Sequence, residues 1–130
     1  MRQKMKKINV STWKEIGLKE IFDIHPTKSY KYTNKDLLNI DGVNPVIGNS
    51  AYNNGIIGYS NLDNTEDGNI ITFSDTTSSE AIFYKKNGFI GYPHIQGMYP
   101  REKYNNWNEY SYLFLLAIIK KAVASLFKVS

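Results

Sequence analysis

Two polar stretches of the chain are rich in amide and hydroxyl side chains, the groups that form directional hydrogen bonds. The first stretch spans Gly48–Gly55, and the second follows the apolar run that ends at Phe73. Such side chains can pair with the donors and acceptors on the edges of DNA bases. The candidates for base contact are Asn49, Ser50, Tyr52, Asn53, Asn54, Ser74, Thr76, Thr77 and Ser78. The same residue types are common in ordinary turns, which is the simpler interpretation at any one position.

Basic side chains near these stretches could hold the phosphates of a nucleic acid. Residues 1–35 carry nine basic and three acidic side chains, residues 36–100 two and seven, and residues 101–130 five and two. The three segments therefore have charges of +6, −5 and +3, within a net charge of +4. The candidates for phosphate contact are Lys28, Lys31, Lys35, Lys85, Lys86, Arg101 and Lys103. Ordinary solvated surface explains such charge runs equally well.

The sequence shows no residues arranged for catalysis. The two histidines, His25 and His94, lie far apart, and neither has a metal-ligating neighbour at helical spacing. His94 fits a packed or hydrogen-bonded histidine better than a metal ligand. The acidic cluster in residues 63–67 matches no defined calcium loop. There is no phosphate loop, no dinucleotide fingerprint and no cysteine. We therefore expect no enzymatic activity, no metal and no cofactor.

Length and composition favour one folded domain. The chain has 130 residues, of which 42% are hydrophobic and 14% aromatic, enough for one packed core. No apolar segment follows the basic N-terminus as in a secretory signal. The apolar run Tyr112–Ile119 is far shorter than the ~20 residues that cross a bilayer. We predict a cytoplasmic protein without a membrane partner, with a flexible basic tail over residues 1–10 and a single domain over residues 11–130.

Period-2 apolar runs and turn signals predict a mixed, mostly antiparallel sheet of the α/β (α+β) class. A short helix is predicted from Asn34, and Asn54-Gly55 and Asn87-Gly88 predict turns. Residues 108–127 lack Gly and Pro and have helical periodicity. They predict a C-terminal helix of roughly 15–20 residues, with Asn108 as its N-cap. Its apolar face could form a homodimer. Strands are expected at residues 12–18, from 23, and at 45–47, 56–59, 70–73, 81–84, 89–92 and 94–99.

Several blocks of the sequence occur in the order typical of one known family. The blocks are Trp13–Ile24, Asn44–Ser50, Asn53–Tyr59, Ile71–Tyr84 and Phe89–Gln96. In this order and spacing the chain resembles the target-recognition domain of type I restriction–modification specificity subunits, and it is most similar to the type IIB-like branch. The resemblance covers residues from about 13 to 127.

The resemblance implies a non-catalytic domain whose exposed loops meet the major groove of duplex DNA. A partner methyltransferase subunit would supply the chemistry and the S-adenosylmethionine site. The chain departs from the family in having one domain without the long helical spacers, and in its acidic middle segment. It could therefore be a stand-alone or split specificity domain. The alternative is an inhibitor from a phage or mobile element that uses the fold to bind and block a restriction or CRISPR nuclease complex, with its acidic loops facing a basic groove.

Overall fold

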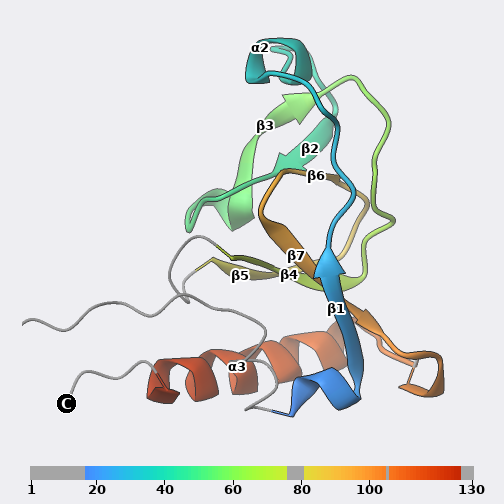
Figure 1. The fold of residues 1–130 in the computed structure, drawn as a ribbon, viewed down its shortest axis with the longest axis vertical. Helices are drawn as coiled ribbons and strands as arrows, with labels where there is room; N and C mark the ends of the chain where they lie inside the picture. The colour runs from blue at the N-terminus through green and yellow to red at the C-terminus, as the bar shows by residue number, and fades with distance from the viewer. Residues whose placement is uncertain (1–16, 76–80, 105, 127–130) are drawn as a thin grey trace, which may run out of the picture.

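The computed structural model describes residues 17–75, 81–104 and 106–126, and these residues are arranged in layers. The long helix α3 (Glu109–Leu126) lies against one face of a four-stranded sheet. A smaller three-stranded sheet and the short helix α2 (Asn34–Leu37) follow on the other side, as Figure 1 shows. Within the described residues, no helix is both long enough and apolar enough to cross a membrane.

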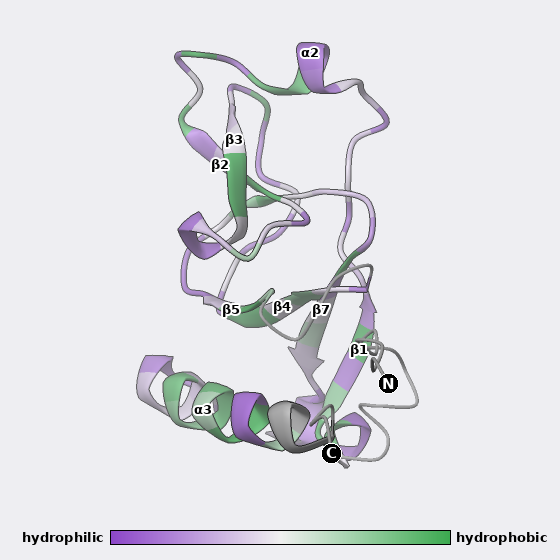
Figure 2. Cartoon of the chain, turned by 90° about the vertical axis from the view of Figure 1, so that its left-hand side faces the viewer, coloured by the Kyte–Doolittle hydropathy of each residue, from purple (hydrophilic) through white to green (hydrophobic). Residues whose placement is uncertain are grey.

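The four-stranded sheet is antiparallel throughout. Its strands are β1 (Phe22–Pro26), β7 (Ile95–Pro100), β4 (Ile70–Ser74) and β5 (Ile82–Lys85), in that spatial order. Residues in β4 alternate between the two faces, as a buried strand requires. Ile71 and Phe73 therefore pack with Tyr112 and Ile119 of α3, while Ile70 packs toward the smaller sheet. Figure 2 shows α3 running beneath this sheet and carrying hydrophobic residues along much of its length.

The smaller sheet joins strands from distant parts of the sequence. β2 (Asn44–Ile47) pairs antiparallel with β3 (Ile56–Ser60) and parallel with β6 (Ile90–Gly91). One side of this sheet packs on the larger sheet, and the other side is covered by Leu37 of α2. Three short 3-10 helices complete the described elements: η1 (Leu18–Glu20), η2 (Asn53–Gly55) and η3 (Glu102–Tyr104).

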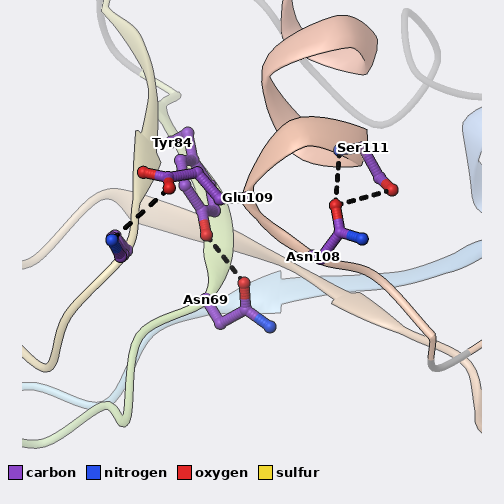
Figure 3. A network of polar contacts seen from close by, with 6 residues as sticks. Asn69, Tyr84, Asn108, Glu109 and Ser111 are labelled. Atoms are coloured by element: carbon purple, nitrogen blue, oxygen red, sulfur yellow. Dashed lines mark hydrogen bonds and ion pairs between the residues drawn. The ribbon is translucent and has the colours of Figure 1, made fainter.

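The first turn of α3 is tied down by polar side chains. Asn108 Oδ1 accepts hydrogen bonds from Ser111 N at 2.9 Å and from Ser111 Oγ at 3.1 Å, which makes Asn108 the expected N-cap. Glu109 forms an ion pair with Lys86 at 3.4 Å, and close by the Tyr84 hydroxyl donates to Asn69 Oδ1 at 2.8 Å (Figure 3). These contacts fix the start of α3 against the end of β5.

The structure confirms the mixed fold class and the C-terminal helix but corrects local details. The prediction of a strand at residues 12–18 is wrong at its C-terminal end, because Gly17 has a left-handed φ of 85° and Leu18 begins η1. Residues 12–16 and the tail over 1–10 lie outside the described residues. The N-cap of α2 is Thr33, whose side chain accepts from Asp36 N, and not Asn34. His94 has a φ of 73° and precedes β7.

Candidate nucleic-acid interface

The loop Gly48–Gly55 contacts the end of β4, where the second polar stretch begins. Ser74, the last residue of β4, donates its hydroxyl to Asn49 Oδ1 at 3.0 Å. These residues are 25 positions apart in the sequence, and β2 brings them together by delivering Asn49 to the end of β4. Ser74 is buried, so its role is to hold Asn49 and not to meet a ligand. Thr76, Thr77 and Ser78 lie outside the described residues.

The loop Gly48–Gly55 has a defined shape. Gly48 N donates to Gly55 O at 2.9 Å, which closes the loop at its base. At the tip, Ser50 Oγ accepts from Tyr52 N at 3.1 Å. Asn53 and Asn54 both adopt positive φ, which asparagine tolerates better than most residues. Asn49, Tyr52, Asn53 and Asn54 are exposed, whereas Ser50 is half-buried. The loop therefore presents one aromatic and three amide side chains to solvent.

Lys85 anchors this loop and is not the exposed phosphate ligand expected from the sequence. Its side chain is 6% exposed, because it lies on the β5 face that is turned away from α3. Its ammonium donates to Asn54 O at 2.7 Å. Burial lowers the pKa of Lys85 to about 8. A pocket of about 370 Å³ opens beside it, lined also by Lys86, Asn87 and Glu109.

A second polar cluster lies at the same end of the four-stranded sheet as Ser74. His94 Nδ1 lies 3.3 Å from Asp75 Oδ1, and Gln96 Nε2 donates to Asp75 Oδ2 at 3.0 Å. Asp75 N also donates to His94 O at 3.0 Å. Sequence reasoning did not select Asp75, His94 or Gln96 as DNA-contacting residues. The amino-acid sequence gives no signal for this cluster, because the cluster forms only through the pairing of β4 with β7.

The remaining basic candidates are scattered over the surface. Lys28 and Lys31 are exposed along the connection from β1 to α2, and Lys35 is exposed on α2. Arg101 follows the far end of β7, roughly 20 Å along the strand from His94. Among these residues, no single basic face forms.

Besides Lys85, the candidate cations Arg101 and Lys86 have polar partners within the protein. Arg101 donates from Nε and Nη2 to Lys19 O at 3.1 and 2.9 Å, which uses part of its guanidinium. Lys86 is paired with Glu109 but stays 60% exposed, and it lines the same pocket as Asn54. Lys86 is therefore the exposed cation placed best to accompany the loop Gly48–Gly55.

The acidic residues near position 66 have a structural role. Glu66 accepts from Lys28 N and from the Tyr99 hydroxyl, both at 2.8 Å, and so ties the β1–α2 connection to β7. Among the residues that the structure describes, no three side chains of the metal-ligating types come together. The chemistry available at the loops is hydrogen bonding and charge.

The comparisons with known proteins identify the family and the fold. The family model described as the type I restriction modification DNA specificity domain matches residues 10–130. The chain belongs to this family. The specificity domain also has the fold of a solved protein, the S subunit of a type I restriction–modification system from M. genitalium, at 17% identity and a TM-score of 0.60. The match covers 97% of this chain but 29% of that subunit, so the domain spans less than a third of it. No curated protein sequence matches the chain.

Proposed function

We propose that this specificity domain recognises a base sequence in duplex DNA and catalyses no reaction itself. The observation that supports the proposal is the contact between Asn49 and Ser74, which fixes the loop Gly48–Gly55 against the end of β4. Amide side chains on a fixed loop match the paired donors and acceptors in the major groove, where each base pair presents a distinct pattern. Asn49, Asn53 and Asn54 supply such groups.

The weak clustering of positive charge bears on how tightly the domain binds. Phosphate contacts supply much of the affinity of DNA-binding proteins, and few cations lie near the loop. We expect the isolated domain to bind non-specific DNA with a Kd on the order of micromolar or weaker at physiological salt. The domain would then act together with a methyltransferase or nuclease subunit of a cytoplasmic restriction–modification system, whose surface would add phosphate contacts. The alternative that the chain inhibits such a complex stays a prediction.

Binding to a randomised duplex pool tests the proposal. We expect an enriched base motif, with an affinity that falls steeply as the salt concentration rises, because cations are released from the DNA. Fluorescence anisotropy at two salt concentrations, followed by sequencing of the bound fraction, measures both. The double variant Asn49→Ala/Asn53→Ala should reduce the preference at the motif by at least about ten-fold, since each well-placed base contact contributes about 1–3 kcal/mol.

Asn106 provides a matched control for that experiment. It is an exposed asparagine that precedes α3 and lies outside the loop Gly48–Gly55. Asn106→Ala should bind the motif like the wild type. Binding without any enriched motif would contradict the proposal and would shift the interpretation toward a protein partner.

We also propose that a second copy of the chain is the partner of the outer face of α3. Tyr110, Leu113, Phe114 and Ile118 are exposed there at the spacing of one helical ridge. Glu109 begins the helix, and the exposed Lys121 lies near its other end. A two-fold antiparallel pair of α3 helices would bury the ridge and bring each Glu109 toward the Lys121 of the other copy.

The expected homodimer is weak, because one helix face buries less than the about 800 Å² per partner of a standard interface. Sedimentation over a concentration series should show a monomer–dimer equilibrium near micromolar concentrations. Phe114→Glu should remain monomeric throughout, because it places a charge in the centre of the ridge. Val43→Glu changes an equally exposed apolar side chain that precedes β2, and it should dimerise like the wild type. A wild type that is monomeric at every concentration would rule out this pairing.

A further inference from the structure

The backbone at His94 adopts a left-handed conformation that is uncommon for residues other than glycine. Its φ of 73° lies in the left-handed region, which glycine and asparagine occupy at lower cost than histidine. The side chain is 65% exposed, so burial in the core does not compensate for this conformation. Folding alone would favour glycine or asparagine at this turn. The imidazole is therefore a candidate for a role outside the stability of the fold.

The ring is held in place by groups from two neighbouring strands. Its Nδ1 lies 3.3 Å from Asp75 Oδ1. The second oxygen of the same carboxylate accepts from Gln96 Nε2 at 3.0 Å, and Asp75 N donates to the carbonyl of His94. A carboxylate at Nδ1 selects the orientation and tautomer of the ring, and leaves Nε2 as the second hydrogen-bonding group.

The imidazole ring of His94 lies at the same end of the four-stranded sheet as the contact between Ser74 and Asn49. Asp75 directly follows Ser74, whose hydroxyl holds Asn49, so one short segment supports both the asparagine and the histidine. With its proton on Nδ1, a neutral imidazole accepts a hydrogen bond at Nε2. The matching donors in the major groove are the amino groups of adenine and cytosine.

We propose that His94 reads one base edge in the major groove, with Asp75 and Gln96 as its positioning residues. The inference deepens the proposed function and rests on it. His94 would accept from an adenine or cytosine amino group through Nε2. Asp75 would not touch the DNA but would keep the ring in the reading orientation.

The variants His94→Gly and His94→Asn separate recognition from folding. Both residues accept a φ of 73° more readily than histidine, so both variants should melt at or above the wild-type temperature. The motif enriched by each variant from the randomised duplex pool should lose its preference at one base pair and retain the others. Affinity for the wild-type motif should fall about five-fold, as expected for one neutral hydrogen bond. Asp75→Ala should weaken the preference at the same base pair.

His25, the other histidine of the chain, is the control. It lies on β1 and stacks on Tyr99 at 4.1 Å between ring centroids, and His25→Asn should leave the motif unchanged. A wild-type protein without any motif would reject the proposed function itself. An unchanged motif in a folded His94→Gly variant would overturn the inference alone. An affinity of the His94→Gly variant that falls equally for every DNA sequence would also overturn the inference, because such a loss indicates a phosphate contact.

Discussion

Replacing Gly91 by alanine should lower the free energy of unfolding by about 3 kcal/mol, because the backbone around it leaves no room for a methyl group. A Cβ atom at Gly91 would lie 2.5 Å from Lys28 O and would also overlap the side chain of Thr27. These groups cannot move away easily: Thr27 N donates to Ile95 O at 2.9 Å, and Lys28 N donates to Glu66. The change would force the β1–α2 connection away from β6.

Chemical denaturation of both proteins measures this loss, and Gly17→Ala is the matched control. Gly17 has a φ of 85°, but a Cβ there meets no atom within 4 Å. Its replacement should cost only the strain of a left-handed alanine, about 1 kcal/mol. A Gly91→Ala variant no less stable than Gly17→Ala would show that the β1–α2 connection yields where we expect it to be rigid.

Raising the pH from about 7 to about 9.5 should increase the free energy of unfolding by about 2 kcal/mol through Lys85. Burial lowers its pKa from 10.5 to about 8 in the folded protein, while the unfolded chain keeps the ordinary value. Between these values the unfolded state binds more protons, so stability rises with pH. The gain should level off above about pH 10.5, as the unfolded state also loses the proton. Burial also raises the pKa of Tyr99 and Tyr112, whose unfolded forms ionise above about pH 10 and oppose the gain.

Urea denaturation across this pH range tests the assignment to Lys85. The Lys85→Met variant should lose the rise and should be more stable than the wild type near pH 7, because it no longer buries an ammonium. The Lys86→Met variant removes a neighbouring, exposed lysine and should retain the rise. A wild-type stability independent of pH between about 7 and 9.5 would contradict the burial of a charged Lys85. Because Lys85 also holds Asn54 O, Lys85→Met should loosen the loop Gly48–Gly55 despite the gain in stability.

Local patterns in the sequence were sufficient to predict most of the helices and strands. The Gly- and Pro-free segment after Trp107 predicted α3, and Asn108 caps it as expected. The apolar run at residues 70–73 predicted β4, and the structure packs its two faces on different layers. These predictions succeed because helix and strand periodicities depend on residues close in the chain. The family resemblance is likewise confirmed, since the family model covers residues 10–130.

Local sequence patterns did not predict the roles of individual polar residues. Lys85 has the sequence context of an exposed lysine beside Lys86, but strand alternation turns it inward toward Asn54. His94 was expected inside a strand, yet it occupies a strained turn against Asp75. Each error concerns a contact between segments at least 19 residues apart. Such contacts depend on strand register and on which sheet face is covered, neither of which short-range patterns encode.

The sequence by itself therefore determined most of the secondary structure, the fold family and the candidate side chains for DNA contact. Those properties follow from periodicity, turn chemistry and residue type, which are local. The tertiary structure alone decided which polar side chains contact one another. The pairing of β4 with β7 places Asp75 beside His94, and the packing of the two sheets places Asn49 on Ser74 and Lys85 under Asn54. Because a shift of one residue in strand register would turn every one of these side chains to the opposite face, these contacts exist only in the folded domain.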